Sequence, residues 1–356
     1  MKILVTGACG FVGSSLIRHW VESGTGHQIT GMDSLIRPGS ETNRKQLKQW
    51  GVKLYHGDIR IPSDFEALPS VDWVIDAAAN PSVLAGIDGK TSSRQLIEHN
   101  LEGTLNMLEF CKTQRAGFIL LSTSRVYSIK PLASLAVEVK NKAFYPKESP
   151  SWLKGMTLKG VNEDFSTHPP LSLYGTSKFS SEALALEYGE VFGFPVFINR
   201  CGVLSGAGQF GHAEQGIFSY WIHSWREKRP LRYIGFGGKG YQVRDSLHPH
   251  DLGALLEKQI HSPKSSAHKV LNISGGLENS MSLAQLSLWC ENKFGKHKVS
   301  PGTKTRLFDI PWLVLDSSRA KKAWNWKPKI GLQEILNEIA GFADKNPNWL
   351  KICSPL

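Results

Sequence analysis

A glycine-rich loop stands directly after the short apolar run at the start of this 356-residue chain. The run from Lys2 to Thr6 has the composition of a buried strand, and the spacing of an amphipathic helix continues from about Val12 to Glu22. The tight turn between them needs the positive φ of glycine, and a diphosphate held against its backbone leaves no room for a Cβ atom. Free N–H groups at the start of the following helix can then bind phosphate. The sequence therefore predicts a strand–turn–helix unit for a dinucleotide, and the alternative is an ordinary turn without a ligand.

Short β-branched runs alternate with amphipathic stretches through the first two-thirds of the chain. This alternation is typical of a parallel sheet covered by helices. We therefore expect an α/β fold, a Rossmann-type doubly wound parallel sheet with a smaller mixed α/β C-terminal lobe. Strands are expected at Lys2 to Thr6, His27 to Met32, Lys53 to His56, Trp73 to Asp76, Gly117 to Ser122 and Val196 to Asn199. Helices are expected at about Val12 to Glu22, Ser93 to Lys112 and Leu173 to Phe192.

The sequence changes character after residue 199, where it becomes rich in aromatic residues and glycine. We expect residues 1–200 to form an NAD-binding domain to which residues 240–262 return, and residues 201–239 and 263–356 to form a substrate-binding lobe. The segment from Ser128 to Ser172 is rich in Lys, Pro and Ser. Because structureless loops of that length in compact domains are usually functional, it is predicted to be a loop that could act as a lid.

The composition restricts the partners that this chain can have. A formal net charge of +11 favours an anionic partner, but Lys and Arg are dispersed, so a solvated basic surface is expected in place of a nucleic-acid site. No run of 18 apolar residues and no signal-peptide pattern occurs, which predicts a cytoplasmic protein without a membrane span. The five cysteines are scattered and should be reduced thiols. His248 and His250 lack a cluster of partner ligands, so no metal site is expected.

An acidic residue follows the second predicted strand. Asp33 stands 20 residues after Gly13, where a carboxylate accepts hydrogen bonds from the adenosine ribose and repels a 2′-phosphate. NAD is therefore favoured over NADP, although Arg37 nearby leaves NADP open. Asp58 follows the third strand, where it either reaches the adenine or is an ordinary turn residue.

A tyrosine and a lysine stand four residues apart in the predicted helix that begins near residue 173. Tyr174 and Lys178 thus share one helix face, and the ammonium is expected to lower the pKa of the phenol toward neutrality. A tyrosinate can take the proton of a hydroxyl group while hydride leaves the same carbon. Thr123 ends the fifth strand, at the edge where open α/β sheets bind ligands.

These three features together resemble the extended short-chain dehydrogenase/reductase family, the nucleotide-sugar epimerases and dehydratases. The resemblance implies that Tyr174 is the catalytic base, that Lys178 binds the nicotinamide ribose and that Thr123 orients the sugar hydroxyl or ketone. It also implies the cofactor NAD, a nucleotide-sugar substrate and a homodimer formed by the helices around residues 93–112 and 173–192. The expected cofactor-binding residues are Gly7, Cys9, Gly10, Phe11, Val12, Gly13, Asp33, Ser34, Arg37, Asp58, Ile59, Ala77, Ala78, Ala79, Asn100, Ser122, Tyr174 and Lys178.

Several stretches are similar to the CDP-paratose 2-epimerase (CDP-tyvelose epimerase) branch of that family. Besides Cys9, they are residues 33–37, 209–216, 240–245 and 279–283. Dehydratases of the family carry Asp and Glu directly after the threonine, whereas this chain has Ser124 and Arg125. Dehydration is therefore disfavoured. Many members also have His and Asn where this chain has Asp76 and Val203.

The expected substrate-binding residues are Ser124, Arg125, Gln209, Gln215, Arg244 and Arg306. The two last arginines match the family's phosphate ligands, because a guanidinium group binds a diphosphate in bidentate fashion. The alternative for each is a solvated surface residue. The resemblance implies an NAD-dependent epimerase, in particular C2 epimerisation of a CDP-deoxyhexose through a transient ketone. The alternatives are a 4-epimerase or oxidoreductase acting on a UDP-, dTDP- or GDP-sugar, and a non-catalytic dinucleotide-binding or RNA-associated protein.

Overall fold

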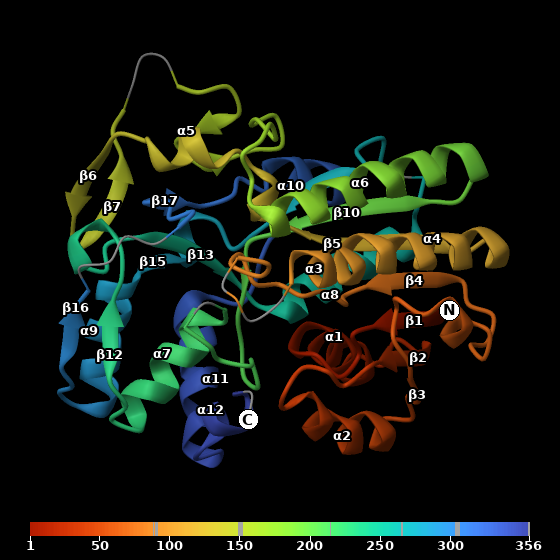
Figure 1. Ribbon diagram of the computed structural model, residues 1–356, viewed down its shortest axis with the longest axis horizontal. Coiled ribbons are helices and arrows are strands. Elements are labelled where there is room, and N and C mark those ends of the chain that lie inside the picture. The colour runs from red at the N-terminus through yellow and green to blue at the C-terminus, as the bar shows by residue number, and fades with distance from the viewer. Residues whose placement is uncertain are drawn as a thin grey trace.

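A seven-stranded parallel sheet forms the larger part of the molecule (Figure 1). The computed structural model describes residues 1–87, 89, 92–148, 152–213, 215–264, 266–302 and 307–354. The strand order is β14-β10-β5-β4-β1-β2-β3, and every neighbouring pair is parallel. The order reverses between β1 and β4, and at such a point the carboxyl ends of the strands leave a crevice for a ligand. The strands are β1 (Lys2–Thr6), β2 (Gln28–Asp33), β3 (Lys53–His56), β4 (Trp73–Asp76), β5 (Gly117–Thr123), β10 (Val196–Cys201) and β14 (Val270–Ile273).

Helices cover both faces of this sheet because its strands are apolar on both sides. Ile3 and Val5 of β1 pack in one core, and Leu4 between them packs in the other. One face is covered by α1 (Phe11–Glu22), α2 (Arg44–Gln49), α8 (Pro249–His261) and α10 (Ser318–Trp324). The other is covered by α4 (Gly103–Gln114) and α6 (Leu173–Phe192), with α3 (Ser93–Ile97) leading into α4 through a π-helical turn, Glu98–Glu102. The doubly wound fold, its six predicted strands and its three predicted helices are thus confirmed, with small shifts of the ends.

A smaller mixed α/β lobe lies beside the sheet, on the left in Figure 1. Its sheet contains β11 (Val203–Leu204), β13 (Val243–Leu247), β15 (Ser280–Ser282) and β17 (Trp312–Leu313), and β12 (Leu231–Tyr233) pairs with β16 (Val299–Pro301). Its helices are α7 (Ile217–Arg226), α9 (Leu283–Phe294), α11 (Leu332–Lys345) and α12 (Trp349–Ile352). The structure differs from the expected division: β14 and α10, assigned to this lobe, are the edge strand and a covering helix of the large sheet, and β13, in the segment 240–262, belongs to the lobe sheet.

The segment from Ser128 to Ser172 is not the structureless lid that its composition predicted. It contains α5 (Ile129–Ala133), β6 (Val137–Lys140), β7 (Ala143–Pro146), β8 (Met156–Thr157) and β9 (Gly160–Val161). Its apolar residues form one core with β13 and β17, and the Val161 amide donates to the Val314 carbonyl over 2.9 Å. The turn of its first hairpin, Asn141 and Lys142, has positive φ at both residues. A lysine is unusual there, so the sequence lacked the common signal of a hairpin turn.

All five cysteines are buried and form no disulfide. Among the described residues, no helix combines the length and the apolar character that crossing a membrane requires.

Candidate active site

A cavity of about 570 Å³ lies at the carboxyl ends of the central strands. Gly7 follows β1, Asp33 ends β2, Gly57 follows β3, Ala77 follows β4 and Thr123 ends β5, and all of them line the cavity. The lobe closes the opposite side with residues from several loops. The cavity therefore spans the switch point of the sheet and the junction with the lobe.

The glycine loop is pressed against the turn that follows β4. Gly7 has a φ of +64°, and a Cβ atom on it would lie 2.9 Å from the Cα atom of Ala78. A Cβ atom on Gly13 would collide with the Gly7 carbonyl oxygen. Gly10 precedes α1 and has no side chain to cap it, so the N–H groups of the first helical turn remain free for an anion. Gly7, Gly10, Phe11 and Val12 line the cavity, whereas Cys9 and Gly13 support the loop from behind.

The carboxylate of Asp33 joins this loop to the end of β2. It accepts a hydrogen bond from the Cys9 amide over 2.8 Å and one from the Leu35 amide over 2.8 Å. Burial raises the pKa of Asp33, and the amide hydrogen bonds oppose that shift. Each carboxylate oxygen can accept a further hydrogen bond, and Asp33 and its neighbour Ser34 both line the cavity. This wall thus offers N–H donors and a carboxylate, the groups that a dinucleotide requires.

The other predicted cofactor residues divide into cavity-lining and supporting groups. The cavity-lining group contains Arg37, Asp58, Ile59, Ala77, Ala78, Ala79 and Ser122. Asn100 is buried and does not line the cavity. Its side chain accepts from the Asn80 amide over 2.8 Å and donates to Ser177 over 3.2 Å, so it fixes the turn after β4 against α6. Its direct partners are therefore protein groups.

The start of α6 brings Tyr174 to the end of β5. The Ser172 side chain caps this helix by accepting from the Gly175 amide over 3.1 Å. A Cβ atom on Gly175 would collide with the carbonyl oxygen of Arg125, so only glycine allows the helix to approach this closely. As a result, the Tyr174 phenol and the Thr123 hydroxyl are hydrogen-bonded neighbours in the cavity wall.

The expected lowering of the Tyr174 pKa is wrong. Burial raises the pKa of this phenol to about 12, and the hydrogen bond to Thr123 and the charge of Arg125 oppose the shift. Lys178 does not line the cavity and is itself almost fully buried. Burial lowers the pKa of Lys178, against the effect of Asp76 and Glu182. The helical spacing thus predicted that Tyr174 and Lys178 share one helix face. Burial, however, favours the uncharged form of both side chains.

Asp76 is a functional candidate that sequence reasoning noted only as a departure from the family. It ends β4, is 1% exposed and accepts hydrogen bonds from Thr6 and Thr104, each over 3.2 Å. Among its electrostatic partners, Lys178 has the largest effect and lowers its pKa, while burial raises it. A carboxylate at the end of an otherwise apolar strand was the signal that could have found it.

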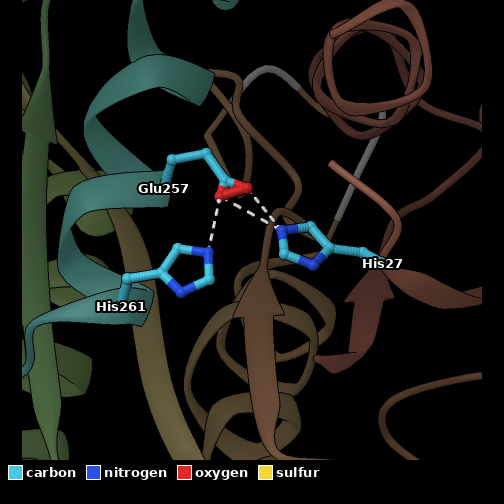
Figure 2. A group of neighbouring side chains, drawn as sticks. All are labelled: His27, Glu257 and His261. Carbon is cyan, nitrogen blue, oxygen red and sulfur yellow. Dashed lines mark hydrogen bonds and ion pairs between the residues drawn. The ribbon is translucent and has the colours of Figure 1, made fainter. Parts of the chain in front are cut away.

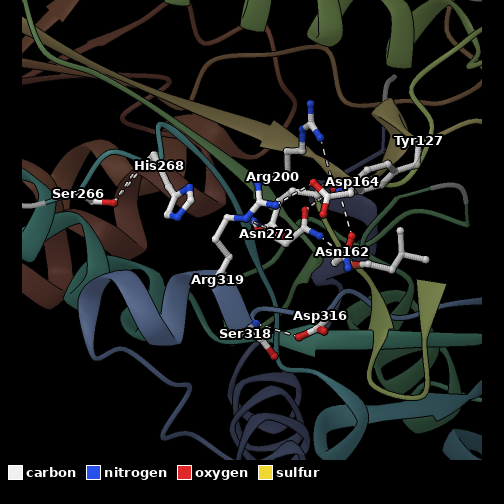
Figure 3. A network of polar contacts seen from close by, with 12 residues as sticks. Tyr127, Asn162, Asp164, Arg200, Ser266, His268, Asn272, Asp316, Ser318 and Arg319 are labelled. Carbon is white, nitrogen blue, oxygen red and sulfur yellow. Dashed lines mark hydrogen bonds and ion pairs between the residues drawn. The ribbon is translucent and has the colours of Figure 1, made fainter. Parts of the chain in front are cut away.

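A second buried network lies behind Ser122 and joins three strands to α6. Ser122 donates to Glu182 over 2.5 Å, and Glu182 forms an ion pair with Arg200 over 2.6 Å. Tyr127 donates to Asn272 over 2.6 Å, and Figure 3 shows Arg200, Tyr127 and Asn272 lying side by side. Tyr127 is 1% exposed, so it anchors the segment after β5 and does not line the cavity.

The predicted substrate residues Ser124, Arg125, Gln209, Gln215 and Arg244 all line the cavity, and Arg306 lies outside the described residues. Gln215 accepts from Arg37 over 2.8 Å, which joins the lobe to the loop after β2. Gln209 donates to the Leu204 carbonyl over 2.5 Å.

The two described arginines of this set contact the loop around residue 308. Arg125 donates to the Phe308 carbonyl over 3.4 Å, and Arg244 lies 3.9 Å from an Asp309 oxygen. Sequence reasoning missed Arg232, Gln242 and Asp309, which also line the cavity. No spacing pattern connects these three residues, so only the folding of the lobe reveals them.

Comparison with known proteins identifies relatives along the whole chain. The NAD dependent epimerase/dehydratase family matches residues 3–274. The CDP-paratose 2-epimerase of Salmonella typhi is 27% identical over 347 residues, which cover 95% of this chain and 98% of that protein. The UDP-glucuronate 4-epimerase of Thermodesulfobacterium geofontis is 25% identical, with 98% of each chain covered.

A solved structure of a nucleotide-sugar epimerase also superimposes on this chain. The crystal structure of UDP-glucuronic acid 4-epimerase from Bacillus cereus, in complex with UDP-glucuronic acid and NAD, superimposes with a TM-score of 0.77 at 25% identity. The match covers 97% of this chain and 99% of that one. The family match extends over far more than half of the chain and includes the glycine loop, Thr123, Tyr174 and Lys178. The chain therefore belongs to the NAD dependent epimerase/dehydratase family, the nucleotide-sugar epimerases and dehydratases of the extended short-chain dehydrogenase/reductase type.

Proposed function

We propose that this chain is an NAD-dependent epimerase that inverts C2 of a CDP-linked deoxyhexose through a transient ketone. The observation that carries the proposal is the hydrogen-bonded pair of Tyr174 and Thr123 in the cavity wall between the glycine loop and the lobe arginines. A phenol and a hydroxyl there can hold one sugar hydroxyl between them. This arrangement suits the removal and return of a single proton.

The residues around the glycine loop fit NAD. Gly7, Gly10 and the first turn of α1 would hold the diphosphate, since a Cβ atom on Gly7 would fill the approach. Asp33 would accept hydrogen bonds from the adenosine ribose with its remaining lone pairs. Arg37 donates a hydrogen bond from Nη1 to Gln215, so this side of its guanidinium group is directed at the lobe. Bound NAD⁺ would supply the hydride acceptor and a positive charge.

Tyr174 would take the proton of the sugar hydroxyl and return it after the ketone has turned. With a pKa of about 12 the phenol holds its proton at neutral pH, so additional positive charge must favour the phenolate during oxidation. Thr123 would hold the carbinol oxygen by hydrogen bonding. Lys178 would contribute its charge from behind, where Asp76 and Glu182 favour the ammonium form.

The residues after Thr123 favour epimerisation over dehydration. Ser124 and Arg125 line the cavity, and neither has a carboxyl group that could exchange protons with the sugar. An epimerase needs no second acid or base, because hydride and proton return to the same atoms. Arg125 and Arg244 would bind the anionic part of the substrate, and the role of Arg306 as a phosphate ligand stays a prediction.

A 4-epimerase acting on a UDP-hexuronate is the second candidate. The observation in its favour is the UDP-glucuronate 4-epimerase relative, which is as fully covered as the CDP-paratose 2-epimerase and only slightly less identical. Both reactions need the same oxidation by Tyr174 and differ in which carbinol it meets. Arg125, one residue beyond Ser124, would suit a sugar carboxylate in this case.

The test is a direct comparison of the two substrates. CDP-paratose and UDP-glucuronate are incubated separately with the protein in deuterated buffer, and the products are identified by NMR spectroscopy and mass spectrometry. We expect conversion of the CDP-sugar with retention of the carbon-bound hydrogen and no accumulation of NADH. Conversion of only the UDP-sugar would replace the proposal by the second candidate. Stoichiometric NADH, or deuterium at the epimerised carbon, would contradict internal return of hydride.

A homodimer and a cytoplasmic location are further proposals. The family resemblance implies a dimer through the helices α3, α4 and α6. Val191 and Phe192, at the end of α6, are 68% and 45% exposed, which supports contact with a second copy. Sedimentation equilibrium of the wild-type chain and of Val191→Glu tests the dimer, because a charge at the interface should shift the variant toward monomer.

A further inference from the structure

Three side chains with metal-binding groups meet near the amino ends of the strands of the large sheet, whereas the cavity lies at the carboxyl ends. His27 directly precedes β2, and Glu257 and His261 stand one turn apart near the end of α8. Figure 2 shows the two imidazole rings directed at the carboxylate of Glu257. Because β2 is parallel to its neighbours, His27 lies at the amino end of the strand whose carboxyl end carries Asp33. The cluster is therefore separate from the candidate active site.

The donor atoms lie close enough together to be shared by one small divalent ion. Nε2 of His27 forms a short hydrogen bond with Oε1 of Glu257 and lies 3.1 Å from Oε2, and Nε2 of His261 lies 3.5 Å from Oε2. One donor atom from each of the three residues lies within 4.8 Å of the other two. Metal–ligand bonds of about 2.1 Å in a tetrahedral shell place neighbouring donors about 3.4 Å apart. An ion can thus enter between the three groups after small side-chain adjustments.

Burial gives the cluster one rigid side and one open side. The His27 side chain is 1% exposed and meets the Trp20 ring edge-on, with centroids 5.9 Å apart. Its Nε2 atom is directed at Glu257, whereas its Nδ1 atom has no hydrogen-bond partner among the described residues. The His261 side chain is 57% exposed. A metal ion can therefore arrive from solvent and keep a water molecule as its fourth ligand.

We propose that His27, Glu257 and His261 bind one Zn²⁺ ion through two imidazole Nε2 atoms and one carboxylate oxygen. Imidazole and carboxylate ligands suit zinc, and three protein ligands with one water complete a tetrahedral shell. A neighbouring hollow is lined by His27 together with Trp20, Val21, Gly24, Thr25, Gly26 and Ile29, and neither Glu257 nor His261 is part of this lining. The ion would fasten the start of β2 to α8, which packs on α1.

The test measures zinc binding by the full-length chain after treatment with a chelator. Isothermal titration with ZnCl₂ at about pH 7.5 should give one ion per chain. His261→Ala and Glu257→Gln should weaken binding at least about tenfold, because even an outer-shell partner of a metal site contributes that much. His261 is exposed, so its variant should fold. His268→Ala removes an exposed histidine far from the cluster and is the matched control.

Two further readouts separate a metal site from a plain hydrogen-bonded cluster. Co²⁺ should produce the visible absorption of a tetrahedral complex in the wild type and in His268→Ala, but not in His261→Ala. Saturating zinc should raise the Tm of the wild type by about 2 to 4 °C and leave that of His261→Ala unchanged. The proposal is overturned if the wild type binds no zinc in a saturable manner, or if His261→Ala and Glu257→Gln bind it as tightly as the wild type does.

Discussion

The two walls of the cavity are built in different ways. The sheet wall, formed by Gly7, Gly10 to Val12, Asp33 and Ala77 to Ala79, consists of strand ends and backbone groups that the parallel sheet aligns. The lobe wall, formed by Gln209, Gln215, Arg232, Arg244 and Asp309, consists of side chains from separate loops. Sheet-wall groups lie where strand register places them, whereas lobe-wall groups depend on one another, as in the contact of Arg244 with Asp309.

This difference indicates where chemistry and specificity reside. A backbone cradle at the ends of strands varies little when side chains change, so it suits a cofactor that a whole family shares. Side chains on loops can be exchanged without disturbing the sheet, so they suit the part of the substrate that differs among relatives. We therefore expect substitutions in the sheet wall to affect all substrates, and those in the lobe wall to affect one substrate more than another.

The largest effect is expected for Tyr174→Phe, at the boundary of the two walls. Loss of the phenol oxygen removes the group that exchanges a proton with the sugar, so kcat should fall about a thousandfold. Steady-state kinetics with the nucleotide sugar measures it, and NAD titration checks that cofactor binding is retained. Tyr188→Phe, on the same helix, is the control. Full activity of Tyr174→Phe would contradict the proposed mechanism.

Gly13→Ala should disturb the glycine loop of the sheet wall and leave the lobe wall unchanged. The new Cβ atom would collide with the Gly7 carbonyl oxygen and displace the loop, which should weaken NAD binding about 10- to 100-fold. Fluorescence titration with NAD measures this effect. Gly341→Ala places its Cβ atom in open space and should leave the affinity unchanged. Equal NAD affinity for Gly13→Ala and the wild type would show that the tight turn serves folding alone.

Arg244→Gln should alter the lobe wall alone. Loss of a charged hydrogen-bond donor should raise KM for the nucleotide sugar about tenfold, while the affinity for NAD stays constant. Arg226→Gln, in the partly exposed ion pair with Asp344, controls for loss of a lobe charge. A matching loss of NAD affinity would mean that the two walls are not independent.

Asp76→Asn tests whether the carboxylate at the end of β4 favours the charged form of Lys178. Asp76 raises the pKa of Lys178, which burial lowers, so the variant should lower that pKa further. Activity that needs the ammonium form is lost as pH rises through this pKa, and the alkaline limb should therefore move to lower pH. We expect about tenfold lower activity at neutral pH. The asparagine oxygen can accept from one of Thr6 and Thr104, and its NH₂ group can donate to the hydroxyl of the other. An unchanged alkaline limb would separate Lys178 from the pH dependence.

The smallest effect is expected for the pH dependence of stability that the buried His223 of the lobe causes. Burial lowers the pKa of His223 on α7 to about 4, so the unfolded chain binds a proton at a pH where the folded chain does not. This difference should cost about 1 kcal/mol of stability between pH 7 and 5.5, as pH falls. Urea denaturation of His223→Leu should show a correspondingly weaker loss. His268→Leu, with an exposed ring, should behave as the wild type does.

The sheet wall could be predicted from the sequence to a large extent. Strand ends follow from apolar runs, and the glycine loop, Asp33 and Thr123 stand directly at those ends, so their meeting at one edge follows from a parallel sheet. Tyr174 and Lys178 share a helix face because four residues make about one turn. The segment after Ser128 was predicted wrongly, because its hairpin turn has Asn141 and Lys142 in place of the common turn residues.

The sequence by itself determined the fold class, the glycine loop and the shared helix face of Tyr174 and Lys178, because these depend on spacing within one element or on strand ends in one sheet. Only the tertiary structure decided the rest. The high pKa of Tyr174, the charge contact of Asp76 with Lys178 and the bond from Arg37 to Gln215 depend on how distant elements pack. Burial and long-range contacts act between residues far apart in the chain, and no local pattern records them.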